Sequence, residues 1–388
     1  MTSKKLKILH LIPTLSSGGA ERQLVNLVTS TSIETFNHVI CVISNSDFFA
    51  GDIRKAGYKV IDLNISAKRP FFQAASAFRK IIKEEKPHII HTWLYDANVS
   101  ARLANLGNSE IPIVTSLQLA DYEPDAAIIG NWNPYKVRAL KVIDKITAMM
   151  TNQYFVPCSK FVKDSYHKFY GISEAKSQVI YNSFSPDLLT VPEDNLKKVA
   201  EEFSFPKDTF VFLNVGRLDP QKNHKLIFDA FQQLLPEIPN AVLLLAGIGG
   251  LEDRLKKYAA DLKIDEKVYF LGRRSDVGAL LEFADVFVFP SFFEGLPVAL
   301  VEAMFKSLPC IASRVKVFEE VLVDGETGLL IDPNNAVELK EVMSKLYKDE
   351  NLRKKIGENA FREAIEKYDI TVTAKEWEKF YQKIKVIV

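Results

Sequence analysis

The sequence predicts an α/β protein made of two Rossmann-like domains that face each other across a cleft. Short apolar runs alternate with amphipathic helical patterns in both halves of the chain, which is typical of β-α-β units with parallel strands. At 388 residues the chain is long enough for two or three domains. A polar stretch at residues 182–207 separates the two patterns, so we assign residues 1–185 to the first domain and residues 186–369 to the second.

The first domain is predicted to begin with a strand. Its strands are expected at residues 7–12, 38–43, 59–63, 87–92, 112–116, 154–157 and 178–181, and its helices at residues 20–29, 71–85 and 97–106. Residues 1–13 have a basic start but only a short apolar run, and they lack a small-residue cleavage site. We therefore expect the first strand there and not a signal peptide.

The second domain repeats the alternation. Its strands are expected at residues 210–215, 241–246, 267–271, 285–289, 309–312 and 328–331, and its helices at residues 225–235 and 251–262. Residues 370–388 form a last helical pattern, in which Trp377, Phe380 and Tyr381 recur at helical spacing.

Composition excludes several classes of protein. Hydrophobic residues make up 47% and charged residues 26% of the chain, as in ordinary globular proteins. No apolar run approaches the roughly 20 residues of a membrane span. Three widely spaced cysteines, Cys41, Cys158 and Cys310, indicate a reducing compartment, so a cytoplasmic protein is expected. Residues 1–185 carry 22 basic and 15 acidic residues, an excess too modest to predict nucleic-acid binding.

A ligand site is predicted around two glutamates in the second domain. Residues 285–289 form a β-branched and aromatic run, and Pro297 is placed to open a helix at its first position. Glu294 therefore lies in a strand-to-helix loop, where open α/β sheets bind ligands, and Glu302 lies about one and a half turns into the helix. The two carboxylates could bind hydroxyls of one extended ligand, or they could simply be solvated side chains.

Four segments together resemble a known family. They are S-S-G-G-A-E-R-Q-L at residues 16–24, V-G-R-L-D-P-Q-K-N at residues 215–223, E-x7-E at residues 294–302, and V-D-G-E-T-G-L-L at residues 323–330. This set resembles the retaining glycosyltransferases of the GT-B fold, family 4, the glycogen-synthase-like superfamily. The resemblance covers nearly the whole chain. It implies transfer of a hexose or N-acetylhexosamine from a nucleotide diphosphate sugar, with UDP expected, to a glycan or lipid-linked acceptor in surface polysaccharide or lipopolysaccharide synthesis.

The resemblance also implies roles for individual residues. Arg217 and Lys222 match the pair that binds the donor diphosphate, and no D-x-D triplet is present, so no metal or other cofactor is expected. Glu302 would bind the ribose and Glu294 the donor sugar. Gly216 would lie in the donor site, and the amides of Gly295 and Leu296 would lie near the sugar or the phosphate. The backbone at Gly272, with Arg273, would contact the nucleobase, or Gly272 could simply form a turn after its strand. The family also leads us to expect that the helix at residues 370–388 packs back on the first domain.

Gly18 and Gly19 follow the first strand and precede a helix, so their N–H groups could approach a phosphate closely. A tight turn explains them equally well. The segment is not G-x-G-x-x-G, and no acidic residue stands out at the end of the second strand, which argues against an NAD-dependent oxidoreductase.

The acceptor side departs from the family pattern. Gln118 stands at about the position where many members carry a histidine near the anomeric carbon, and Lys316 falls where a glycine pair is common. His91, expected at a strand end, and Asp96 are further candidates for the acceptor site. Both have ordinary structural interpretations, as a core histidine and a residue of a helix start.

Two mixed basic and aromatic segments of the first domain, residues 68–80 and 132–141, suit a helix lying on an anionic membrane, or an ordinary amphipathic helix. Peripheral membrane association is therefore expected. Two other functions stay open, a transferase or synthase that uses a soluble sugar acceptor and a degenerate subunit that binds donor without transferring it.

Overall fold

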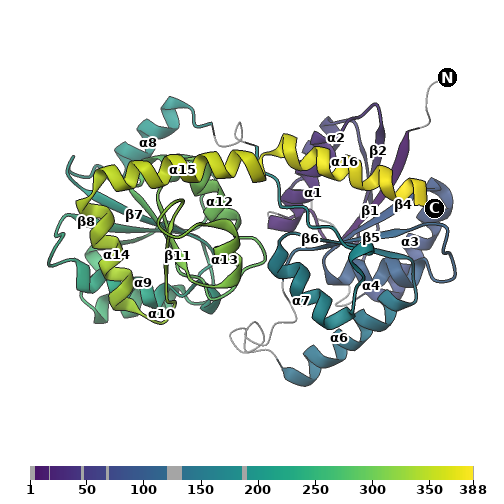
Figure 1. The fold of residues 1–388 in the computed structure, drawn as a ribbon, viewed down its shortest axis with the longest axis horizontal. Coiled ribbons are helices and arrows are strands. Elements are labelled where there is room, and N and C mark those ends of the chain that lie inside the picture. Colours follow the sequence, from purple (N-terminus) through teal and green to yellow (C-terminus); the bar gives the residue numbers. More distant parts are fainter. Residues whose placement is uncertain are drawn as a thin grey trace. The chain divides into compact units, whose positions relative to one another are not determined.

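The computed structural model describes residues 5–16, 18–44, 48–66, 70–119, 133–185 and 190–387 (Figure 1). The chain divides into two compact units. Unit 1 consists of Met1–Ser183 with Tyr368–Val388, and unit 2 of Phe184–Lys367. Both unit boundaries lie two residues before the ones predicted from the sequence, at 183 rather than 185 and at 367 rather than 369.

Unit 1 contains a parallel sheet with the strand order β3-β2-β1-β4-β5-β6. Its strands are β1 (Leu6–Ile12), β2 (Phe36–Val42), β3 (Lys59–Asp62), β4 (Ile89–Trp93), β5 (Ile113–Leu117) and β6 (Gln153–Pro157). β4 and β5 are buried along their whole length, and β1 and β2 at all but one position each, as the continuous apolar runs predict. This is the order of a doubly wound Rossmann sheet.

Helices cover both faces of the unit 1 sheet. The helices are α1 (Gly19–Ser30), α2 (Ala50–Lys55), α3 (Phe71–Glu85), α4 (Tyr95–Ala104), α6 (Pro134–Met149), α7 (Lys160–Tyr170) and α16 (Ile370–Ile387). One core cluster joins the sheet to α1, α2 and α16, and another joins it to α3 and α4. Trp377, Phe380 and Tyr381 of α16 are buried in the first of these clusters, so the last helix belongs to unit 1.

Unit 2 repeats the same topology, with the strand order β12-β11-β10-β7-β8-β9 and all pairs parallel. Its strands are β7 (Phe210–Val215), β8 (Ala241–Ala246), β9 (Val268–Phe270), β10 (Val286–Phe289), β11 (Cys310–Ser313) and β12 (Leu329–Ile331). Its helices are α8 (Glu193–Phe203), α9 (His224–Leu234), α10 (Glu252–Asp261), α11 (Val277–Phe283), α12 (Val298–Phe305), α13 (Lys316–Val321), α14 (Ala336–Lys348) and α15 (Glu350–Tyr368).

The strand order reverses direction at one point in each sheet. This topological switch point lies between β1 and β4 in unit 1 and between β7 and β10 in unit 2. Loops leaving the carboxyl ends of these two strands diverge to opposite faces, and the crevice between them is where such sheets bind ligands. The segments following β7 and β10 contain the residues predicted to bind the donor.

Three local predictions were wrong. Residues 178–181 do not form a strand, although Gln178 and Ile180 donate backbone hydrogen bonds to the β6 residues Phe155 and Pro157. Pro297 is the residue before α12 and not its first residue. His91 lies in the middle of β4 and not at its end.

Candidate active site

The site in unit 2 is centred on an ion pair that spans the switch point. Lys222 ends a short 3-10 helix (Pro220–Lys222) after β7, and Glu294 lies in the loop after β10. Their Nζ and Oε1 atoms are 2.6 Å apart, and the side chains are only 12% and 9% exposed. The Lys222 ammonium also lies 4.5 Å from the centre of the Phe289 ring, a favourable cation–π contact. The sequence places these two residues 72 positions apart, and the fold brings them together.

Hydrogen bonds fix the two loops that carry this pair. Gln221 accepts from the Phe292 N–H at 2.9 Å through its backbone oxygen, and its side-chain Nε2 donates to the Phe293 oxygen at 2.7 Å. Near the carboxyl ends of the two strands that precede these loops, Asn214 Nδ2 of β7 donates to the Val288 oxygen of β10 at 2.7 Å. The pair therefore sits on a braced frame, which reduces the reorganisation needed to bind a ligand.

Arg217 adds a second cation to this edge of the sheet. Its side chain is 73% exposed, and Nη2 lies 3.1 Å from Asp219 Oδ2. Gly216 lies next to it, and a Cβ there would lie 3.2 Å from Lys222 Cε, so a larger residue would have to shift the Lys222 side chain. The predicted diphosphate pair thus consists of one largely buried cation bound to Glu294 and one exposed cation bound to Asp219.

A glycine loop after β8 supports the β7 loop, and sequence reasoning missed it. A Cβ on Gly247 would lie 1.8 Å from the Gly216 oxygen, and one on Gly249 would lie 2.3 Å from the Leu218 oxygen. Gly247 also donates its N–H to the Gly272 oxygen at 2.8 Å. The available signal was the run G-I-G-G at residues 247–250. Gly272 itself has a φ of +63°, so its turn alone accounts for a glycine.

The remaining donor candidates follow the sequence prediction in position. Gly295 and Leu296 are buried between Glu294 and the start of α12, and Glu302 is half-buried within that helix. Arg273 is exposed beside Gly272. Lys316 is the exposed first residue of α13, on the strand-to-helix connection after β11.

Buried polar atoms without a hydrogen-bond partner among the described residues collect at this carboxyl edge. They are Asn214 Oδ1, Asp219 Oδ1, both ring nitrogens of His224, Ser291 Oγ and Ser313 Oγ. Burial and the nearby Lys222 charge lower the pKa of His224 to about 4, so its ring is neutral at pH 7. Since buried polar groups are normally paired, this concentration marks a place where a polar ligand or water supplies the partners. Sequence reasoning did not single out His224, Ser291 or Ser313.

The glycine turn of unit 1 is occupied by a carboxylate from its own helix. Gly18 precedes α1, and a Cβ on it would lie 2.2 Å from Glu21 Oε2. Glu21 Oε1 accepts hydrogen bonds from Thr14 Oγ1 and Ser16 Oγ, each at 3.0 Å. Gly19 is exposed, with open space around its Cα. A fixed negative charge beside Gly18 favours a hydroxyl group over a phosphate at this turn.

His91 is a core histidine, which is one of the two interpretations of the sequence, and its role as an acceptor-site residue was the wrong one. Its side chain is fully buried under α16, with Nδ1 2.7 Å from Tyr381 Oη and Nε2 2.8 Å from Ser116 Oγ. Its ring is tilted against that of His10, and His10 Nε2 lies 2.9 Å from His38 Nδ1. Both ring nitrogens of His91 are therefore engaged within the protein. The sequence could not reveal this because the covering helix lies about 290 residues away.

Gln118 lines a small pocket at the carboxyl edge of unit 1. The pocket is bounded by the end of β5 and the residues after it and by α4, α6 and α7, namely Leu94, Tyr95, Asn98, Ser116, Leu117, Gln118, Leu119, Asp144 and Tyr166. Asn98 is buried there, and its Oδ1 has no partner among the described residues. Asp96 is half-buried in the first turn of α4 and does not line this pocket.

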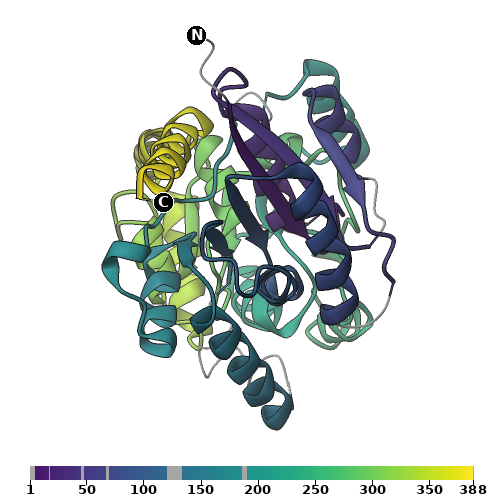
Figure 2. The same cartoon turned by 90° about the vertical axis from the view of Figure 1, so that its right-hand side faces the viewer.

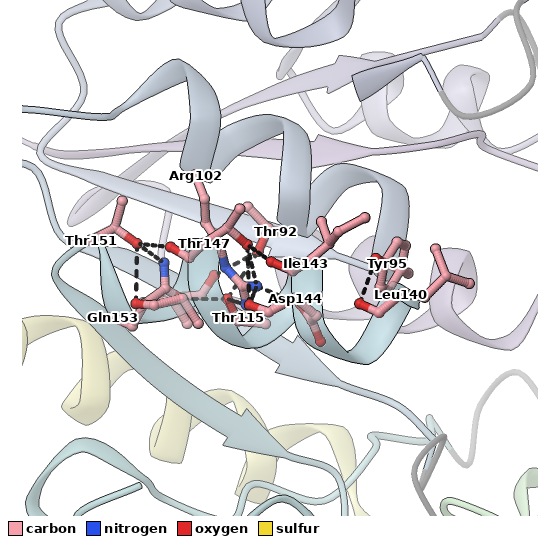
Figure 3. A network of polar contacts seen from close by, with 12 residues as sticks. Thr92, Tyr95, Arg102, Thr115, Leu140, Ile143, Asp144, Thr147, Thr151 and Gln153 are labelled. Atoms are coloured by element: carbon pink, nitrogen blue, oxygen red, sulfur yellow. Dashed lines mark hydrogen bonds and ion pairs between the residues drawn. The ribbon is translucent and has the colours of Figure 1, made fainter. Parts of the chain in front are cut away.

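Below the pocket, a buried ion pair joins α4 to α6 (Figure 3). Arg102 Nη1 lies 2.5 Å from Asp144 Oδ1 and 3.1 Å from the Asp144 backbone oxygen. The same guanidinium reaches Thr147 and Thr115. Arg102 therefore fixes α6 against α4 and is committed to the interior.

Comparison with known proteins identifies the family. A model described as "Glycosyltransferase Family 4" matches residues 17–188, and one described as "Glycosyl transferases group 1" matches residues 197–363. The chain belongs to the family 4 glycosyltransferases. A UDP-Gal:alpha-D-GlcNAc-diphosphoundecaprenol alpha-1,3-galactosyltransferase of Escherichia coli is 27% identical over 346 residues, with 86% of each chain covered. A Campylobacter jejuni GalNAc-alpha-(1->4)-GalNAc-alpha-(1->3)-diNAcBac-PP-undecaprenol alpha-1,4-N-acetyl-D-galactosaminyltransferase is 27% identical, with 98% of this chain and 99% of the relative covered.

Solved structures confirm the GT-B fold of this glycosyltransferase. The crystal structure of Anabaena HepE in complex with UDP-glucose superimposes with a TM-score of 0.81 at 20% identity, covering 97% of this chain and 99% of that one. The predicted α/β class with two Rossmann-like domains is thereby confirmed. Among the described residues, no group of three or more His, Cys, Asp or Glu side chains converges as a metal-binding set would.

Proposed function

We propose that this glycosyltransferase moves a hexose or N-acetylhexosamine from a UDP-sugar to a glycan or lipid-linked acceptor, with retention of anomeric configuration and without a metal. The product would belong to a surface polysaccharide or lipopolysaccharide. The observation that carries the proposal is the Lys222–Glu294 pair at the switch point of unit 2. The Lys222 ammonium could bind a diphosphate, and the Glu294 carboxylate beside it could accept hydrogen bonds from sugar hydroxyls. Both residues lie on loops that are held by hydrogen bonds.

The named relatives support the donor and acceptor classes. The Escherichia coli relative is named for a UDP-galactose donor and an acceptor in which GlcNAc is linked to diphosphoundecaprenol. The Campylobacter jejuni relative is named for an undecaprenol-linked glycan acceptor. Both alignments cover most of this chain, so the proposal applies to the whole molecule.

In the proposed reaction, the bond between the anomeric carbon and the diphosphate oxygen breaks while a bond to an acceptor oxygen forms. Negative charge grows on the departing diphosphate, and Arg217 and Lys222 stabilise it. Lys222 has three N–H donors, so it can bind a phosphate oxygen while keeping Glu294. Glu294 would hold donor-sugar hydroxyls, and Glu302 the ribose.

Retention requires that the acceptor attack the face from which the diphosphate leaves. In the ion pair, Glu294 is bound to Lys222 and is not poised as a free nucleophile. We therefore propose front-face attack, in which the departing diphosphate oxygen takes the proton of the acceptor hydroxyl. We place the reaction in the cytoplasm, which is consistent with three buried cysteine thiols, Cys41, Cys158 and Cys310.

The first experiment measures donor binding and turnover with and without EDTA. UDP-, GDP- and ADP-sugars are tested by thermal shift and by nucleotide release. A metal-independent shift with slow hydrolysis of a UDP-sugar is expected, and both signals should be lost in Lys222→Ala and Glu294→Ala but kept in Lys225→Ala, an exposed cation in the next helix. Wild-type rates in both site variants would refute the site.

Acceptor class and stereochemistry are tested next. A short polyprenyl-diphosphate sugar is compared with free sugars, and the anomeric configuration of the product is read by NMR. Transfer only to free sugars would favour a soluble-acceptor synthase. Donor binding with neither transfer nor hydrolysis would indicate a degenerate subunit.

A further inference from the structure

Helix α6 of unit 1 carries an exposed apolar stripe along its length. Tyr135, Val142, Ile146 and Met149 are 83%, 49%, 52% and 75% exposed, respectively. Their spacings of seven, four and three residues place them on one face of an α-helix, within about 60° of one another. The exposed Ala139 lies on the same face. A continuous stripe of this kind is unlike isolated surface hydrophobic residues, which need no explanation.

The opposite face of α6 already accounts for the packing of the helix. Asp144, Thr147 and Ala148 are buried on that side, and Arg102 of α4 binds Asp144 and Thr147 (Figure 3). Asn133 caps the start of the helix by accepting from the Tyr135 and Lys136 N–H groups. The apolar stripe therefore lies on a firmly held helix. In both ribbon views α6 lies at the periphery of unit 1 (Figures 1 and 2).

Basic residues flank the stripe. At 100° per residue, Arg138 and Lys145 lie on one side of it and Lys136 on the other. Lys136 and Arg138 are exposed and form no ion pair within the described residues. Lys145 donates to the Phe169 oxygen and keeps its charge over the Phe169 ring. The single acidic residue of the helix, Asp144, is bound to Arg102. The outer surface of α6 is therefore apolar and cationic.

Helix α3, which has a similar composition, lacks this arrangement. Phe72 is 81% exposed, but Gln73, Ser76 and Lys80 share the outer surface, and Ala74, Ala75, Phe78 and Ile82 are buried inward. Composition alone predicts the same behaviour for both helices, whereas their exposed faces differ. α3 is thus a matched internal control.

We propose that α6 docks this glycosyltransferase on an anionic lipid bilayer, with the apolar stripe at the boundary of the acyl chains and the cations at lipid phosphates. The chemistry matches an interfacial helix, in which buried apolar area and basic side chains act together. Among the described residues, no helix is long and apolar enough to cross a membrane, so this contact would be peripheral. The inference goes beyond the proposed transfer reaction and does not depend on the identity of donor or acceptor.

The test is cosedimentation of the full chain with vesicles of phosphatidylcholine alone or mixed with phosphatidylglycerol. Wild type should bind the anionic vesicles and be released by salt. Lys136→Gln with Arg138→Gln should weaken binding about 25-fold, since each cation contributes a factor of about five, equivalent to ~1 kcal/mol. Val142→Ser with Ile146→Ser should weaken it at least as much. The α3 variant Phe72→Ser with Lys80→Gln should bind like wild type.

Three results would overturn the proposal: wild type that ignores anionic vesicles, α6 variants that bind like wild type, or an α3 variant that loses binding equally. A change from dimer to monomer in Val142→Ser with Ile146→Ser, without a change in vesicle binding, would assign the stripe to a second copy of the chain. Thermal unfolding and donor hydrolysis in every variant separate docking from misfolding and from failure of the transfer proposal.

Discussion

The two switch points of this molecule have the same strand order but opposite chemistry. Between β7 and β10 of unit 2, Lys222 and Glu294 form an ion pair at the carboxyl edge of the sheet. Several buried polar atoms nearby have no hydrogen-bond partner among the described residues. Between β1 and β4 of unit 1, most polar side chains near the switch point have partners within the unit, and Asn98 Oδ1 is an exception. Glu21 is bound by Thr14 and Ser16, and His91 by Tyr381 and Ser116.

This difference shows what topology decides and what it leaves open. The Rossmann order determines where a ligand can bind, because both sheets open their loops at the same relative position. Which ligand can bind then depends on which polar atoms at the carboxyl edge of each sheet still lack a hydrogen-bond partner. In unit 2 several buried polar atoms at this edge have no partner among the described residues, whereas Glu21 and His91 of unit 1 are hydrogen-bonded within their own unit. Each prediction below tests one side of this contrast.

The largest effect is expected from the buried ion pair of unit 1. Arg102→Ala should lower the free energy of unfolding by about 3–5 kcal/mol, because it leaves Asp144 charged and buried without its partner. Urea denaturation measures this. Arg274→Ala removes a partly exposed cation bound to Glu202 and Asp276 and is the control, with a loss of about 1 kcal/mol or less.

A double variant separates lost charge from lost packing. Arg102→Met with Asp144→Leu should recover much of the stability, since no buried charge remains. If Arg102→Ala alone costs no more than Arg274→Ala, the view that unit 1 depends on internally paired polar groups is wrong.

The next largest effect is expected on the catalytic rate, from a substitution in unit 2. Lys222→Ala should lower kcat by about 10²- to 10³-fold, or ~2.7–4 kcal/mol, because a fixed donor to the developing charge is removed. Stability should also fall, because Glu294 loses its partner, but by less than in Arg102→Ala, since Lys222 and Glu294 are partly exposed whereas Arg102 is not. Steady-state kinetics with the best donor measures the loss, with Lys225→Ala as the cationic control. A fall in kcat of less than threefold would show that the pair does not serve the departing diphosphate.

Acid should destabilise unit 1 more than unit 2. Burial lowers the pKa of His38 to about 3, and that of His10 and His91 also falls, whereas an unfolded histidine has a pKa near 6.5. Below pH 6.5 the unfolded chain binds protons that the folded chain does not, so stability decreases as pH falls. His38 alone should cost ~2 kcal/mol between pH 6.5 and 5.

Hydrogen exchange resolves this effect by unit. Amides of β1 and β4 should lose more protection on acidification, after correction for intrinsic rates, than amides of β7 and β8. Unit 2 contains His224, whose pKa is lowered to about 4, so a smaller loss is expected there. Equal losses in the two units would contradict the assignment of the histidine cluster as the acid-sensitive element.

The strands were predictable because most are continuous apolar runs, and β7 and β8 match their predicted bounds. Only the family resemblance placed Lys222 and Glu294 in one site, since local sequence patterns do not predict contacts between residues 72 positions apart. His91 was misplaced for the same reason, as Tyr381 comes from the far end of the chain. The supporting glycines Gly247 and Gly249 were missed because their cause is contact with another loop.

The smallest effect tests whether the glycine turn of unit 1 binds phosphate. Gly18→Ala should cost ~1 kcal/mol of stability, because its Cβ displaces the Glu21 carboxylate from Thr14 and Ser16. Gly19→Ala meets no neighbour and should leave stability equal or slightly raised. If Glu21 rather than a phosphate occupies this turn, the donor KM should stay within about twofold of wild type in Gly19→Ala, since the added methyl group blocks only a phosphate approaching from solvent. A tenfold rise in donor KM in Gly19→Ala, with unfolding unchanged, would instead show that the diphosphate contacts this turn and would contradict the contrast between the two switch points.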